Sequence, residues 1–174
     1  MNTEQWLEKI LSSKEELYHW LQRQYVGEVN AARKIHELSE REGLTDGERR
    51  VLRSIASDES THANWVFALL QTRGIPLPDL NTGEERYWKP ILAEAKTFAE
   101  IAAAGHHAEG MRLVRIRALS ECEKIDEDIR NVFKKILPDE IFHEKAFGIL
   151  SSPEAREKMR GKHDEGLALL GLEI

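Results

Sequence analysis

Cysteine is almost missing from this 174-residue sequence, which contains only Cys122. A single thiol excludes an internal disulfide and every metal site that is built from several cysteines. Aromatic residues are also few, at 7%, and there are only five prolines, whereas charged residues reach 32%. This balance is typical of long helices with solvent-facing sides and argues against a sheet-rich fold.

Long apolar runs are missing as well. No segment approaches the length of a membrane span, and residues 1–5 lack the basic and apolar regions of a signal peptide. The net charge of -6 comes from acids interspersed with lysine and arginine, so no basic nucleic-acid footprint stands out. We therefore expect a cytoplasmic protein whose partners include neither a membrane nor a nucleic acid.

Helical periodicity runs through most of the chain, and we expect an all-α fold in a single domain, residues 1–174. A helical hairpin is predicted over about 13–72, with Ser13 and Glu16 as the cap of its first helix and a break at Gly43–Gly47. Residues 73–90 are expected to form a crossover. A second hairpin follows over about 91–150, with Pro138 inside a continuous helix, and a C-terminal helix over about 152–170. The first ten residues suggest a short extra helix.

The strongest signal is an internal repeat. Shifted by 81 residues, the segment 28–62 aligns without gaps on 109–143, and twelve of the 35 positions are identical. Shared leucines and glutamates are common among helices, but an Asp-Glu-x-x-His motif at both ends of the shift is not. The chain therefore reads as two copies of one helical hairpin.

Hairpin geometry selects six residues as metal ligands. In each hairpin two glutamates are 31 positions apart (59 − 28 and 140 − 109), so each lies about 20 Å from its turn at about 1.5 Å per residue. In each second helix the glutamate and the histidine three residues later share one face. Packing the hairpins face to face brings four carboxylates and two imidazoles to one level: Glu28, Glu59, His62, Glu109, Glu140 and His143.

Four converging carboxylates need positive charge beside them, and two divalent cations supply four. Carboxylate with imidazole suits iron or manganese better than calcium or structural zinc. A further Glu-x-x-His, Glu16 to His19, lies about half a helical turn away from Glu28, so we expect His19 to face outward.

These residues resemble the ferritin-like di-iron carboxylate proteins: bacterioferritins, rubrerythrins and di-iron oxygenases. The resemblance implies a four-helix bundle with two iron ions, or a mixed manganese–iron pair. It implies that Glu28 and His62 belong to one ion and Glu109 and His143 to the other, with two bridging glutamates, Glu59 and Glu140. It further implies that Asp58 and Asp139 orient the ligating histidines.

Three further residues flank the expected ligands. Tyr25 and His106 are repeat equivalents, one turn before the first glutamate of each hairpin, where each can donate a hydrogen bond, carry a radical, act as an additional ligand or simply pack. Arg112 follows Glu109 by three residues and can pair a ligand carboxylate, recognise a substrate or form a surface salt bridge. Rubrerythrins carry a further ligating glutamate at this spacing, so Arg112 argues against rubrerythrin-type peroxidase action while leaving the di-metal site intact.

The function that these features favour is an oxidoreductase that activates oxygen or hydrogen peroxide at a di-iron centre. Two alternatives stay open: a ferroxidase that stores iron in a hollow shell, and a bundle that binds metal without catalysis. The sequence contains no Cys-x-x-Cys electron-transfer motif, so we expect an external electron donor, or iron itself, to supply electrons. We expect the protein to form a homo-oligomer, and a small organic substrate is compatible with these features.

Overall fold

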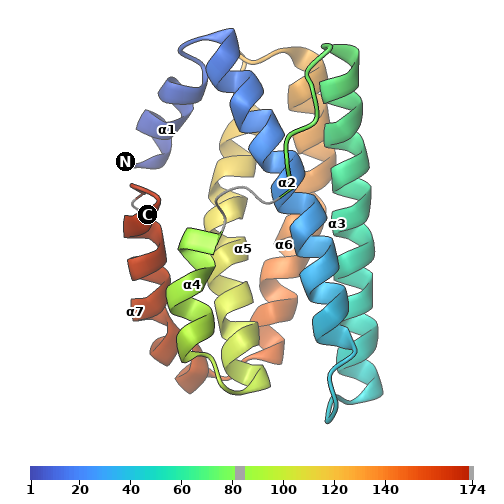
Figure 1. Cartoon of the computed structure of the whole chain (residues 1–174), viewed down its shortest axis with the longest axis vertical. Coiled ribbons are helices and arrows are strands. Elements are labelled where there is room, and N and C mark those ends of the chain that lie inside the picture. The colour runs from blue at the N-terminus through green and yellow to red at the C-terminus, as the bar shows by residue number, and fades with distance from the viewer. Residues whose placement is uncertain (81–84, 173–174) are drawn as a thin grey trace. The chain divides into compact units, whose positions relative to one another are not determined.

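The computed structural model describes residues 1–80 and 85–172, and within this part of the chain all regular structure is helical (Figure 1). The predicted all-α fold class is confirmed. The helices are α1 (Thr3–Ile10), α2 (Lys14–Ser39), α3 (Asp46–Thr72), α4 (Glu85–Glu94), α5 (Phe98–Glu121), α6 (Glu127–Leu150) and α7 (Pro153–Leu169).

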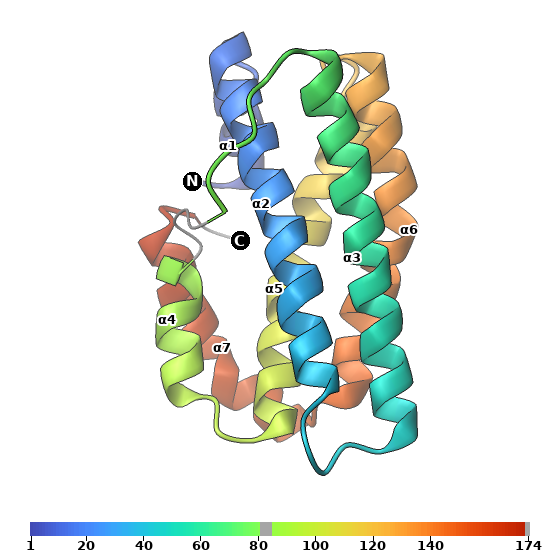
Figure 2. The ribbon, with the colours of Figure 1, turned by 45° about the vertical axis from the view of Figure 1, so that its right-hand side comes forward.

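The described residues form two compact units, and each contains one copy of the repeat. The first-hairpin unit is Ile10–Thr82, and the second-hairpin unit combines Met1–Lys9 with Gly83–Ile174. Within the first, α2 packs against α3; within the second, α5 packs against α6 and α7, and α4 packs against α7. Both views show each hairpin as two long helices side by side, joined by a short turn (Figures 1 and 2).

Capping residues and a turn glycine mark the ends of the helices of the first hairpin. The Ser13 hydroxyl accepts a hydrogen bond from the Glu16 backbone N–H at 3.2 Å, which confirms the predicted cap of α2. Thr45 and Glu48 form a complete capping box at the start of α3. The break predicted at Gly43–Gly47 begins slightly earlier in the structure, because α2 already ends at Ser39. Gly43 has a φ of 83° in the turn that follows, a conformation that favours glycine.

The identical arginines of the repeat brace both turns. Arg49 donates to the carbonyl oxygen of Ser39 at 2.7 Å and to that of Arg41 at 2.8 Å. Its repeat equivalent, Arg130, donates to the carbonyl oxygen of Cys122 at 3.4 Å. Both arginines therefore satisfy carbonyl groups that the end of a helix leaves open, which gives this repeat identity a structural reason.

Helix α6 runs from residue 127 to residue 150 with Pro138 inside it, as the sequence predicted. The start of the preceding helix differs from the expectation. A third helix was expected from about Ile91, within a hairpin beginning there, but α4 ends at Glu94 and α5 begins only at Phe98. The reason is a capping box in which Thr97 and Glu100 hydrogen-bond to each other's backbone N–H groups.

Helices α4, α5 and α7 enclose an apolar core. It includes Tyr87, Ile91, Ala103, Ala104, Ala108, Ala155, Met159 and Leu167. Lys158 of α7 donates to the Glu100 carboxylate at 2.6 Å and so ties α7 to the first turn of α5. The amino terminus donates to the carbonyl oxygen of Gly171 at 3.2 Å, which places the two ends of this unit together. None of the described helices is both long and apolar enough to cross a membrane.

Candidate metal centre

The first hairpin brings three of the predicted ligands together in its interior. Glu28 of α2 and Glu59 and His62 of α3 are all 0% exposed. The Nδ1 atom of His62 lies 3.5 Å from Oε2 of Glu59 and 3.9 Å from Oε2 of Glu28. Gln24, one turn earlier on α2, donates to Oε1 of Glu28 at 2.6 Å. We call Glu28, Glu59 and His62 the first triad.

The second hairpin repeats this arrangement. Glu109 of α5 is 4% exposed, and Glu140 and His143 of α6 are 0% exposed. The Nδ1 atom of His143 lies 3.9 Å from Oε2 of Glu140. Glu109, Glu140 and His143 form the second triad, in which the ligand atoms lie within 4.8 Å of one another, as they do in the first.

The residues of each triad fit a metal ion. Two glutamates and a histidine in a dry interior leave negative charge that burial makes costly, and one divalent cation per triad offsets it. Among the described residues, Oε2 of Glu109 is buried without a hydrogen bond, and Nδ1 of His62 and Nδ1 of His143 each face a carboxylate. Carboxylate oxygens and imidazole nitrogens in this arrangement suit a cation in each triad.

The arginine beside the second triad reaches its carboxylates. Nη2 of Arg112 donates to Oε1 of Glu140 at 3.0 Å, and Nη1 lies 3.7 Å from Oε2 of Glu109. The Arg112 side chain is 20% exposed, so it extends from the surface of the hairpin to its buried acids. Of the three roles open to Arg112 from the sequence, the structure places it in pairing with expected ligands.

The other flanking residues make different contacts. Tyr25 packs its ring against Phe67 at 6.1 Å between centroids. His106 places Nδ1 3.0 Å from the carbonyl oxygen of Glu144 and 3.2 Å from its Oε1, so this nitrogen is held by α6 outside the second triad. His19 is exposed, as the helical periodicity predicted.

The two expected orienting residues, Asp58 and Asp139, are half-buried and directly precede Glu59 and Glu140 on their helices. Their predicted role of orienting the two ligating histidines stays a prediction.

A Tyr–His–His cluster in the core between α4, α5 and α7 was missed from the sequence; Tyr87 and His163 are buried and His107 is half-buried. The Tyr87 hydroxyl lies 2.6 Å from Nδ1 of His163, and the His163 ring stacks on that of His107 at 5.2 Å. Burial, followed by the charge of His107, lowers the pKa of His163 to about 4, and burial together with the charge of Glu109 raises the pKa of Tyr87. Both groups are therefore neutral at pH 7. Residues 87 and 163 lie 76 positions apart, so no local pattern joins them.

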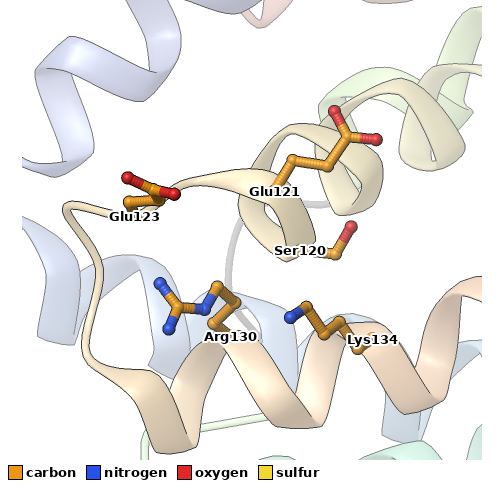
Figure 3. Close-up of a pocket in the computed structure, with 5 residues that line it drawn as sticks. All are labelled: Ser120, Glu121, Glu123, Arg130 and Lys134. Atoms are coloured by element: carbon orange, nitrogen blue, oxygen red, sulfur yellow. The ribbon is translucent and has the colours of Figure 1, made fainter.

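Two cavities of the described residues are lined by residues outside the triads. One of about 580 Å³ lies at the turn of the second hairpin and is lined by Arg130 and Lys134 of α6 and by Ser120, Glu121 and Glu123 (Figure 3). Another of about 210 Å³ borders α2 and α3 near His36 and Arg53. The first cavity has both acidic and basic side chains in its wall, and one of them is Arg130, which braces the hairpin turn.

Comparison with known proteins identifies one family. The sequence model of the rubrerythrin family matches residues 12–150, a segment that spans both hairpins and both triads. Comparisons with curated proteins and with solved structures give no significant match.

Proposed function

Since the chain belongs to the rubrerythrin family, we propose that its two triads together hold two iron ions and that the protein is an oxidoreductase that reduces oxygen or hydrogen peroxide there. The observation that carries this proposal is the duplicated triad. Two hairpins of one repeat each bury two carboxylates and an imidazole with ligand atoms within 4.8 Å. Burial of that charge in both copies favours a pair of cations as their common partner.

Each residue of the triads has a role in this proposal. Glu28 and His62 bind one ion, and Glu109 and His143 bind the other. Two carboxylates, Glu59 and Glu140, bridge the pair, so the four glutamates balance two divalent charges. Asp58 and Asp139 fix the tautomer and orientation of the ligating imidazoles. Two neighbouring redox-active ions supply, when bound, two electrons to an oxidant at one site.

The ligand chemistry suits iron and leaves room for a mixed manganese–iron pair. Electrons come from an external donor, because the single cysteine of the sequence offers no Cys-x-x-Cys motif. A small organic substrate and assembly into a homo-oligomer belong to the same proposal.

Anaerobic titration with Fe(II), followed by exposure to oxygen, tests the proposal. We expect saturation at two irons per chain, then growth of ferric absorbance and consumption of oxygen. Saturation far above two per chain, together with a large hollow assembly, would support iron storage in its place. Binding of two irons without oxygen consumption would support a non-catalytic metal-binding protein, and no binding would reject the di-iron site.

A separate experiment compares hydrogen peroxide with oxygen as the oxidant. Arg112 stands where rubrerythrins have a further ligating glutamate, so we expect the reduced protein to react faster with oxygen than with peroxide. Stopped-flow oxidation by each oxidant at equal concentration measures the ratio. A strong preference for peroxide would show that the arginine does not change the chemistry typical of the family.

A further inference from the structure

One side of α6 combines exposed apolar residues with exposed positive charge. Between residues 131 and 149, the exposed side chains of this helix are three apolar residues, three lysines and an asparagine: Pro138, Phe142, Ile149, Lys134, Lys135, Lys145 and Asn131. Phe142 is 46% exposed and Ile149 is 84% exposed. In this fully described stretch no acidic side chain is exposed, although the whole chain has a net charge of -6. We call these residues the α6 face.

The first hairpin shows that the fold does not require apolar residues on this face. The α3 residues at the positions equivalent to 138, 142 and 149 are small or polar, and they are exposed too: Ser57, Thr61 and Ala68. Large apolar side chains on a surface mark a contact with a partner when they gather on one face. Since the two hairpins share their architecture, we look for the reason for Phe142 and Ile149 outside the fold of the hairpin.

Phe142 connects the α6 face to the second triad. Its ring meets the ring of His143 edge to face, with 6.1 Å between the centroids, and His143 is 0% exposed. The Phe142 side chain therefore extends from the surface to a proposed metal ligand of the same unit. A redox partner on this face would be separated from that imidazole by a single aromatic ring. Thr61, the equivalent residue of the first hairpin, has no ring with which to make such a contact.

The charge of the α6 face favours an acidic partner. Exposed lysines beside an apolar centre attract an acidic surface and speed its approach. Asp139 and Glu144 of the same stretch are half-buried, so the lysines dominate the exposed charge. Small interfaces with an aromatic centre and a polar rim suit the weak encounters of electron-transfer proteins. A second copy of the chain fits less well, because a two-fold contact through this face would place lysines against lysines.

We propose that the α6 face is the docking surface of the external electron donor, and that this donor is a small acidic protein that carries one electron. Each docked carrier loses one electron and is oxidised, while one ferric ion is reduced to ferrous. Two such transfers return both ions to the ferrous state, and no bond forms or breaks in this step. The inference rests on the proposed function, because it names the donor that reduces the same pair of ions.

Anaerobic stopped-flow reduction of the ferric protein tests the inference. Reduced plant-type ferredoxin, a small acidic iron–sulfur protein, is the carrier, and an uncharged hydroquinone is the reductant that needs no docking. Lys145→Gln with Ile149→Ser removes one charge and one apolar side chain from the face and leaves Phe142 and the triads intact. Reduction of this variant by ferredoxin should be about tenfold slower, whereas reduction by hydroquinone should be unchanged. Added salt should slow the ferredoxin reaction of the wild type.

The matched control is Arg50→Gln with Ala68→Ser, which makes the same change in net charge at exposed positions of α3. It should react like the wild type with both reductants. Equal slowing of both double variants by ferredoxin would overturn the inference, since net charge would be the cause. Slower reduction of the α6 variant by both reductants would overturn it too, because the substitutions would then have changed the metal centre.

Calorimetric titration of the metal-free chain with oxidised ferredoxin gives a result that does not depend on iron. We expect weak, salt-sensitive binding to the wild type and a dissociation constant about tenfold larger for the α6 variant. No binding to the wild type would overturn the inference. Light scattering and vesicle binding test the other occupants. Loss of a wild-type assembly in the α6 variant, or binding of the wild type to phosphatidylserine vesicles but not to ferredoxin, would also overturn it.

The two proposals fail in different ways. If the wild type binds no iron, the proposed function fails and the electron transfer with it, while ferredoxin binding still decides whether the α6 face docks an acidic carrier. If the wild type binds two irons and the α6 variant matches it in ferredoxin binding and reduction, only this inference fails.

Discussion

Two glycines of α5 that flank the second triad have opposite surroundings. A Cβ atom at Gly105 would lie 2.8 Å from Cδ1 of the Phe147 ring on α6, whereas one at Gly110 would meet nothing within 4 Å. Gly105 is therefore a packing residue that lets α6 approach α5. Gly110 has no such reason, and it weakens the helix by the usual cost of glycine.

This contrast predicts opposite effects of the same substitution. Gly105→Ala should lower the free energy of unfolding by about 1–3 kcal/mol, because a buried methyl forces Phe147 off its position. Gly110→Ala should raise it by about 0.5–1 kcal/mol. Urea denaturation of the metal-free protein measures both. Equal effects of the two changes would mean that Phe147 yields without cost.

At this scale the candidate site was largely predictable, because its residues repeat. The doubled Asp-Glu-x-x-His motif and the matching separations of Glu28 and Glu109 from it selected six residues, and the structure gathers three of them in each hairpin. The contact of Arg112 with Glu140 was only one of the three roles that the sequence left open for Arg112. The two residues are 28 positions apart, and the sequence does not determine the direction of a flexible side chain.

At the scale of helices, the boundary between α4 and α5 shows where sequence reasoning fails. The signal was present, since Thr97 and Glu100 have the spacing of a capping box. The two residues lie within a longer run of residues that are all compatible with a helix. The apolar periodicity therefore predicted one continuous helix across the break between α4 and α5. Helix α4 was missed because Pro90 and the prolines before it favoured an irregular crossover, yet α4 contains Pro90.

The cap gives a direct test of that boundary. Thr97→Ala removes the hydroxyl that accepts from the Glu100 backbone N–H at 3.2 Å, and should cost about 1 kcal/mol of stability. The control is Thr61→Ala, an exposed position inside α3, where alanine is the better helix former. If both variants unfold at the same urea concentration, the Thr97 cap does not stabilise α5.

The core between α4, α5 and α7 carries a pH dependence of its own. His163 faces Tyr87 of α4 and His107 of α5, with Asp164 next to it on α7, and its pKa is lowered from 6.5 to about 4. The unfolded chain takes up a proton at His163 as the pH falls through about 6.5, and the folded chain does not. The contribution of His163 is complete above that pH and is lost as the pH falls toward 4.

We therefore expect the wild type to lose stability between pH 6.5 and 4 by up to ~1.4 kcal/mol per pH unit from this residue. In His163→Gln the slope over this range should be shallower, even if the variant is less stable at pH 7. Urea denaturation at several pH values measures the slope, and His19→Gln, an exposed histidine, is the control. An unchanged slope in His163→Gln would show that other groups cause the acid loss.

For the whole molecule, the duplication gives each of the two units one triad of the proposed metal ligands. The first-hairpin unit supplies Glu28, Glu59 and His62, and the second-hairpin unit supplies Glu109, Glu140 and His143. Each triad supplies three of the six proposed ligands, so we expect binding of both ions to require both folded repeats. Metal binding and the stability of the whole chain are then linked.

The linkage predicts how metal acts on unfolding. Fe(II) added anaerobically at about 100 times its dissociation constant should stabilise the chain by about 2.7 kcal/mol per ion, and a chelator should reverse the gain. Glu59→Gln with Glu140→Gln should abolish this rise while the chain still folds, since amides of the same shape relieve the repulsion between buried acids. Glu42→Gln with Glu123→Gln, an exposed pair at equivalent repeat positions, should keep it. Differential scanning calorimetry, together with iron analysis, measures the metal-induced stabilisation of both double variants. Full stabilisation of the Glu59→Gln, Glu140→Gln variant by Fe(II) would show that these two carboxylates do not bridge the ions.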